Sequence, residues 1–156
     1  MMSNKEPMTE YGYKKLTHEL SDLKKRQRPE TVIELDVARS HGDLKENAEY
    51  HAAKDRLAFI DSRIAELSDL VARSQVINPS TYEHDKVRFG STVMLENLET
   101  NEEVTYTIVG STESNPDRGL ISYHSPLSKQ LMGRGEGEEV TIHLPNGKQE
   151  YEILEI

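Results

Sequence analysis

Apolar side chains in the first half of the chain recur at the spacing of α-helices. Thr9 is a good N-cap, and a packing stripe follows it at Tyr13, Leu16, Leu20 and Leu23. A second stripe, within a segment expected from about Leu44 to Arg73, steps by three and four residues like the seam of a coiled coil: Leu57, Ile60, Ile64, Leu67 and Val71. The pattern predicts two long helices that pack against each other as an antiparallel hairpin.

The first helix contains one strong interruption. Pro29 follows a basic run, and proline inside a helix removes a backbone donor. Because apolar residues at helical spacing resume from Val32, we expect a kink at Pro29 and not the end of the helix.

The turn between the two helices carries the most distinctive chemistry. Gly42 suits the left-handed backbone that closes a helix, and Asp43 with Glu46 has the form of a capping box for the next one. That arrangement predicts two carboxylates on one helix face at an exposed tip. Two hypotheses remain open here: the pair only caps a helix, or it contributes ligands to Mg²⁺, whose octahedral shell needs further ligands from elsewhere.

The pattern changes after Asn78-Pro79-Ser80. Apolar residues now alternate, as in strands, in four sets: Val87 and Phe89; Val93 and Leu95; Val104, Tyr106 and Ile108; Val140, Ile142 and Leu144. Pro145-Asn146-Gly147 marks a hairpin, and Ser125-Pro126 begins a short helix that ends by Gly133. The chain is thus predicted to be α+β, with a helical hairpin at 1–78 and a mainly antiparallel sheet domain with one short helix at 79–156.

Composition and charge narrow the function. The chain has no cysteine and no long apolar run, so we expect a cytoplasmic protein with no membrane partner. Residues 1–78 hold 13 Lys and Arg against 14 Asp and Glu, whereas residues 79–156 hold 6 against 14. Such an acidic half disfavours nucleic-acid binding, and it suits either a basic or mixed protein surface or simple solubility.

The stretch from Gly42 to Tyr50, GDLKENAEY, resembles the signature of the bacterial Gre transcript-cleavage factors. Arg28-Pro29-Glu30 and Ala38-Arg39-Ser40-His41 are similar to the first helix of that family, and Ser122–Leu127 is similar to its second signature. Ser128 and Gln130 stand where the family usually has smaller residues. Length and acidity are closer to the more acidic of the family's two main branches.

The resemblance implies a coiled-coil arm, an FKBP-like C-terminal domain and a monomer that is not itself an enzyme. It implies that this domain, through Ser125 and Pro126, docks on bacterial RNA polymerase at the rim of the secondary channel. Asp43 and Glu46 would then hold Mg²⁺ jointly with polymerase carboxylates and stimulate cleavage of backtracked RNA. Lys54 and Arg56 would face the nascent RNA 3′ segment.

Two other functions deserve comparison. A channel-entering relative that only blocks the polymerase should have an altered tip, whereas Asp43 and Glu46 are both present. A prolyl isomerase or chaperone would need an aromatic-lined pocket, and after residue 78 the chain offers only five aromatic residues, Tyr82, Phe89, Tyr106, Tyr123 and Tyr151.

Overall fold

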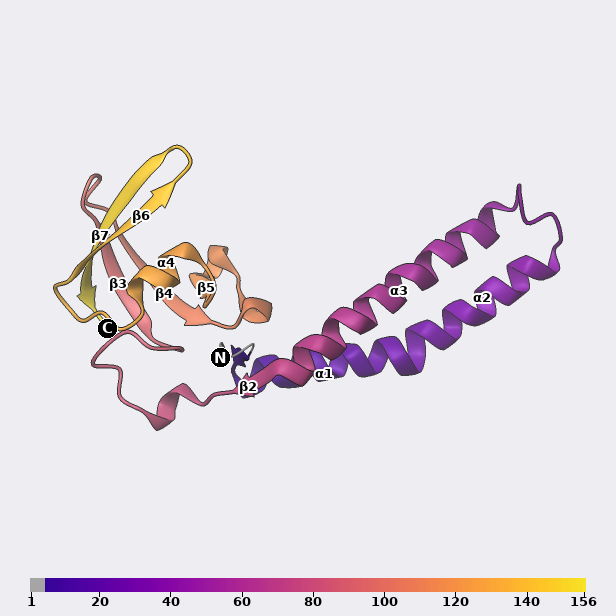
Figure 1. The fold of residues 1–156 in the computed structure, drawn as a ribbon, viewed down its shortest axis with the longest axis horizontal. Coiled ribbons are helices and arrows are strands. Elements are labelled where there is room, and N and C mark those ends of the chain that lie inside the picture. The colour runs from indigo at the N-terminus through magenta and orange to yellow at the C-terminus, as the bar shows by residue number, and fades with distance from the viewer. Residues whose placement is uncertain (1–4) are drawn as a thin grey trace. The chain divides into compact units, whose positions relative to one another are not determined.

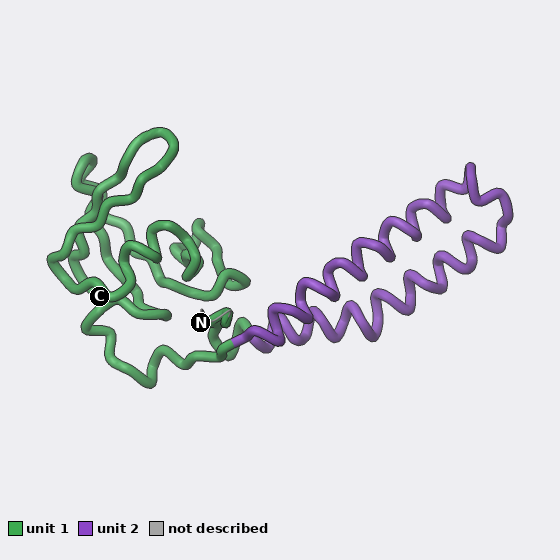
Figure 2. Tube along the Cα trace, in the orientation of Figure 1, with its two compact units in different colours: residues 1–12, 75–156 green, residues 13–74 purple. Residues whose placement is uncertain are grey.

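The computed structural model describes residues 5–156, which form two compact units (Figures 1 and 2). Residues 13–74 form one unit, called the arm below, and residues 75–156 form the other together with the N-terminal segment up to Gly12. This division differs from a boundary at 78/79. The N-terminal segment joins the second unit because β1 (Glu6–Met8) pairs with β2 (Ser74–Val76), and the Ile77 amide donates to the Met8 carbonyl at 2.8 Å.

The predicted helical hairpin is confirmed. Its first limb is α1 (Glu10–Asp22), a π-helical turn η1 (Leu23–Gln27) and α2 (Arg28–Ser40); its second limb is α3 (Ala48–Arg73). Thr9 caps α1 as expected, since its Oγ1 accepts from the Gly12 amide at 3.2 Å. The 26 residues of α3 span ~39 Å at 1.5 Å per residue.

The buried residues of the two limbs differ in spacing. On α3 they are seven residues apart, at Ala53, Ile60 and Leu67. On the first limb the sequence Leu16, Leu23, Thr31, Ala38 contains one step of eight between two steps of seven. The π-helical turn lies within the longer step. It therefore accommodates one additional residue while the apolar stripe keeps facing inward.

Pro29 explains why the wider turn lies where it does. A proline in a regular α-helix leaves the carbonyl four residues earlier without a donor and clashes with it. In η1 the Arg28 amide instead donates to the Leu23 carbonyl, five residues back, and Thr31 Oγ1 donates to the Gln27 carbonyl at 2.8 Å. The expected kink thus takes the form of a π-helical turn that relieves the helix just before the proline.

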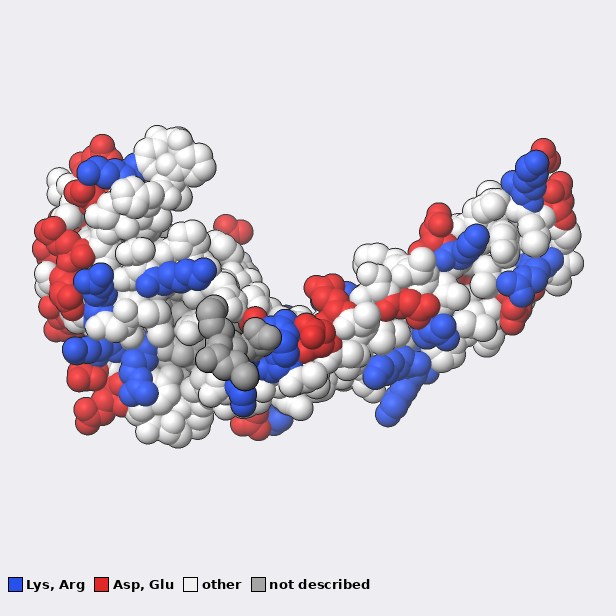
Figure 3. Space-filling model, in the orientation of Figure 1, with Lys and Arg blue, Asp and Glu red and all other residues white. Residues whose placement is uncertain are grey.

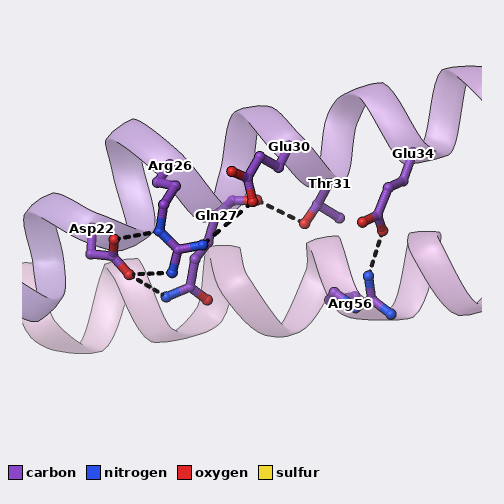
Figure 4. Close-up of polar contacts among 7 residues, drawn as sticks. All are labelled: Asp22, Arg26, Gln27, Glu30, Thr31, Glu34 and Arg56. Carbon is purple, nitrogen blue, oxygen red and sulfur yellow. Dashed lines mark hydrogen bonds and ion pairs between the residues drawn. The ribbon is translucent and has the colours of Figure 1, made fainter.

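Polar side chains join turns within and between the helices (Figure 4). Asp22 accepts from Arg26 Nε at 2.7 Å and from Gln27 Nε2 at 2.8 Å, and these contacts hold the pKa of the Asp22 carboxyl at about 2, the Arg26 contact contributing most. Between limbs, Arg28 Nε lies 2.7 Å from an Asp61 oxygen, and Arg56 pairs with Glu34. All of these groups are at least partly exposed, so each pair contributes little to stability on its own.

The pKa of Asp22 predicts a pH dependence. Because the carboxyl has a lower pKa in the folded protein than its ordinary value of 3.8, its stabilising effect should be complete above about pH 5 and should disappear as the pH falls through about 2. Asp22→Asn should therefore be less stable than wild type at pH 7, and the difference should disappear below about pH 2. Urea titrations of both proteins followed by circular dichroism test this, and a difference that is independent of pH would contradict it.

The second unit is built around a five-stranded sheet of order β5-β4-β3-β7-β6. Its strands are β3 (Thr92–Asn97), β4 (Glu103–Val109), β5 (Leu120–Ser122), β6 (Glu139–Leu144) and β7 (Gly147–Glu155). Only the β4–β5 pair is parallel, so the sheet is mainly antiparallel as predicted. The short helix α4 (Pro126–Leu131) contributes Leu131 to a core that includes Val93, Leu95 and Ile153.

One detail of the strand pattern was wrong. Val87 and Phe89 are buried but lie outside any strand, because Val87 bonds through its amide and carbonyl to Arg134 and Gly133 of a loop. The hairpin predicted at Pro145-Asn146-Gly147 is confirmed: Leu144 pairs with Gly147, so Pro145 and Asn146 are the two turn residues.

The strand register lines up four glutamates across the sheet. Glu103 lies opposite Glu96, Glu96 opposite Glu152, and Glu152 opposite Glu139. Like charges directly opposite each other on neighbouring strands destabilise a sheet. Four of the 14 acidic residues of the second half therefore lie in one row across the sheet, whereas Figure 3 shows basic and acidic groups interspersed along the arm.

Candidate functional site

The segment His41–Asn47, called the tip loop below, joins the two limbs of the arm. Gly42 has φ +79°, the left-handed conformation predicted for it, and its amide donates to the Arg39 carbonyl at 3.2 Å. Nothing would lie within 4 Å of a Cβ atom at this position. Glycine is therefore favoured here for its backbone conformation and not for lack of space.

The capping box predicted at the tip is wrong. Asp43 has φ +27° and lies in the loop, and Glu46 also precedes the first residue of α3, Ala48. The N-cap is Asn47, whose Oδ1 accepts from the Tyr50 amide at 3.0 Å. The two carboxylates therefore do not share a helix face, and helix capping does not account for them.

Asp43 and Glu46 nevertheless line one open hollow of about 510 Å³. Its wall includes Glu49 and His41, and both tip carboxylates are exposed. Among the residues that the structure describes, neither carboxylate has a hydrogen-bond or ion-pair partner. Free, solvated carboxylate oxygens are the hard ligands that Mg²⁺ prefers, so the pair fits part of a magnesium coordination shell.

The described part of the chain does not supply a complete set of ligands. Over residues 5–156 no group of three or more His, Cys, Asp or Glu side chains is placed to hold a metal ion. We therefore predict that the isolated protein binds Mg²⁺ only weakly, with a dissociation constant in the millimolar range, because two exposed carboxylates leave most of the octahedral shell to water. Calorimetry with Mg²⁺ measures this directly. Micromolar affinity that is lost in Asp43→Asn would contradict the prediction.

Lys54 and Arg56 both lie on α3 and are exposed, but they do not form one patch. Two residues apart on an α-helix, their side chains leave the axis about 200° apart. Arg56 points towards α2 and pairs with Glu34 (Figure 4). Of the two, only Lys54 is without an acidic partner among the described residues.

The second sequence signature lies at the start of α4. Ser125 is the N-cap, accepting from the Ser128 amide at 3.1 Å, and Pro126 is the exposed first helical residue. Ser128 is fully buried, where its Oγ accepts from Ser125 Oγ at 2.9 Å, so its size affects the interior and not a docking surface. Gln130 is exposed.

Sequence reasoning missed two residues that support the tip loop. Asn47 caps α3, and its Nδ2 also donates to the Ala38 carbonyl at 2.6 Å. His51 Nε2 lies 3.2 Å from the Lys45 carbonyl, so the Nε2–H form of the ring donates to the loop. Asparagine and aspartate are equally good N-cap residues. The helical spacing of apolar residues begins after Asn47, and this was the signal that could have identified it as the N-cap.

Models of the same protein family match both halves of the chain. The family model described as "Transcription elongation factor, N-terminal" matches residues 6–76, and "Transcription elongation factor, GreA/GreB, C-term" matches residues 82–156. The "Transcription elongation factor GreA" of a Nitratiruptor species is 61% identical over 155 residues, covering 99% of this chain and 94% of that protein. The protein of the same name from Helicobacter hepaticus is 60% identical over 151 residues, covering 97% of this chain and 93% of that protein.

Among solved structures, that of the transcription factor Gfh1 aligns with a TM-score of 0.48 at 26% identity, covering 98% of this chain and 97% of that one. Neither of the two sequence relatives is a prolyl isomerase, so that alternative gains no support. No helix within residues 5–156 is both long and apolar enough to cross a membrane.

Proposed function

The chain belongs to the GreA/GreB family of transcription elongation factors, and on that premise we propose that it stimulates the cleavage of backtracked RNA by bacterial RNA polymerase. The observation that carries this proposal is the tip loop, where Asp43 and Glu46 line one hollow and have no partner among the described residues. A helix pair about 40 Å long, ending in two free carboxylates, is suited to enter a channel and complete a site inside another protein.

In this proposal the protein is not itself an enzyme. Asp43 and Glu46 would hold Mg²⁺ together with carboxylates of the polymerase, which supply the ligands that the chain lacks. A magnesium ion bound there would activate water for attack on the RNA phosphodiester and neutralise charge on the phosphate. The protein's own contribution is to deliver two negatively charged ligands and to hold them in place during that step.

The open, unpaired state of the two carboxylates suits this role. A carboxylate already bonded to a lysine or arginine of its own chain would have to break that bond before binding a metal ion. The side-chain contact between His41 Nδ1 and a Glu49 oxygen at the tip is 3.9 Å long and leaves Asp43 and Glu46 uninvolved.

The second unit would bind the polymerase. We place the contact at Ser125 and Pro126, since Pro126 is exposed at the start of α4, where Ser125 fixes the backbone as N-cap. The secondary-channel rim of the largest subunit is the proposed contact, and the nascent RNA 3′ segment is the proposed neighbour of Lys54. Because the polymerase works in the bacterial cytoplasm, we expect the protein there.

The test is a single-turnover cleavage assay on an arrested elongation complex. The protein should shorten the transcript from its 3′ end, and the complex should then resume synthesis. If the protein binds the polymerase but leaves the transcript intact, it is a blocking factor and the proposal is wrong.

A further inference from the structure

Asn47 uses both ends of its side-chain amide to join the two limbs of the arm. Its Oδ1 accepts from the Tyr50 amide at 3.0 Å, at the start of α3. Its Nδ2 donates to the Ala38 carbonyl at 2.6 Å, in the last turn of α2. The side chain is half-buried, so water competes only partly for these two bonds.

Both ends of the amide have a defined use. The last carbonyls of a helix lack donors within the helix, and the first amides lack acceptors. The Ala38 carbonyl accepts from the His41 amide at 3.2 Å, and its second lone pair is open to a side-chain donor. One residue can donate to that carbonyl and accept from an orphan amide of α3 at the same time only if its side chain carries both functions on a short stem. Asparagine does this, aspartate cannot donate when ionised, and serine can cap but has the shorter side chain.

We propose that Asn47 is a positioning residue for the two tip carboxylates. The tip loop is held at its two ends by α2 and α3, and the bond from Asn47 to Ala38 fixes the separation of those ends. Asp43 and Glu46 lie between them. The inference rests on the proposed function of these carboxylates and goes beyond it by naming the contact that holds them.

His51 supports the same loop from the first turns of α3. The contact of its Nε2 with the Lys45 carbonyl, at 3.2 Å, lies one residue from Glu46. It is exposed on the surface, whereas the Asn47–Ala38 bond is shorter and half-buried. We therefore expect the loss of Asn47 to have the larger effect.

The expected consequence is a mobile tip loop on an intact hairpin. Misplacement of catalytic groups by about 1 Å can reduce a rate by about 100-fold. Removing only the donor to Ala38 should therefore slow stimulated cleavage by about tenfold or more at saturating protein. The concentration that gives half-maximal cleavage should change little, because the docking surfaces are untouched.

Asn47→Ser separates the two bonds of the amide. Serine still caps α3, because its hydroxyl can accept from the Tyr50 amide, but it is too short to reach the Ala38 carbonyl. Asn78→Ser is the matched control: Asn78 also caps a helical turn, with its Oδ1 accepting from the Ser80 amide at 3.1 Å, and lies outside the arm.

The first measurement does not involve the polymerase. The chain has no cysteine, so Leu44→Cys gives a single site for a spin label in the middle of the tip loop. The label should become more mobile in Asn47→Ser and stay unchanged in Asn78→Ser, while thermal unfolding of the helices stays close to that of the labelled parent. The second measurement is the cleavage rate of the unlabelled variants at saturating concentration.

A mobile label together with slower cleavage supports the proposal. Unchanged mobility overturns it, and so does a mobile loop that cleaves within about twofold of wild type. If the wild-type protein itself stimulates no cleavage, the proposed function fails and the positioning role fails with it. The assay of the wild-type protein alone identifies that case. The mobility of the spin label still shows whether the bond from Asn47 to Ala38 holds the tip loop.

Discussion

Asp43→Asn combined with Glu46→Gln should abolish stimulated transcript cleavage while the arm stays folded and polymerase binding persists. The two amides keep the size of the carboxylates but remove both negatively charged ligands. Neither residue caps α3, a role that belongs to Asn47, so the double change removes no capping bond. We expect a loss of about 100-fold or more, corresponding to ~3 kcal/mol of barrier.

Single-turnover cleavage with polymerase sites saturated measures this loss. The variant should also compete with wild type, because in our proposal the second unit and not the tip carboxylates binds the polymerase. Asp36→Asn with Asp55→Asn is a charge-matched control, since both positions are exposed on the arm outside the tip loop. Cleavage by the tip variant within about twofold of wild type would refute a metal-binding role for the tip.

Leu67→Ala should cause the largest loss of stability in the arm. Leu67 is fully buried on α3, in the stripe with Ile60 and Ala53. Truncating a buried leucine removes its packing contacts and leaves a cavity, at a cost of about 2–5 kcal/mol. The effect should be confined to the arm, because the second unit has a core of its own around Leu95 and Ile153.

Urea unfolding followed by far-UV circular dichroism reports mainly on the helices of the arm. Leu57→Ala, at a half-buried position of the same helix, should lower the free energy of unfolding by clearly less than Leu67→Ala does. Near-ultraviolet signals provide the comparison for the second unit, because five of the seven tyrosines lie there and only Tyr13 and Tyr50 lie in the arm. Equal costs at the two positions would mean that Leu67 does not form the centre of this interface.

The sequence predicted the helices well and their boundaries less well. The heptad spacing on α3 is a local property of one helix, and it was sufficient to identify the seam. At the tip, Asp43 and Asn47 are both residues that cap helices, so local preference could not choose between them. The bond from Asn47 to Ala38 is between residues nine positions apart and depends on the hairpin having formed.

The sequence predicted only part of the site, because the local pattern does not show which residues form a loop and which a helix. The motif identified Asp43 and Glu46, but a helical spacing was assumed for residues that form a loop. Lys54 and Arg56 were grouped because of the family resemblance, although a spacing of two residues on a helix separates their side chains. The row of four glutamates was not predictable from alternation alone, because it depends on strand order and register.

The π-helical turn at Leu23–Gln27 has a consequence for how the arm can change in length. In a regular helix, each residue gained or lost rotates everything beyond it by about 100°, which would turn the tip carboxylates away from their direction. At η1 the additional residue is absorbed by a wider turn, and the stripes on either side remain in phase with α3. At this turn the first limb can therefore contain one more residue without a change in the direction in which the tip carboxylates point. The direction in which the Asp43 and Glu46 side chains point therefore depends on η1, about four helical turns away, as well as on the tip loop itself.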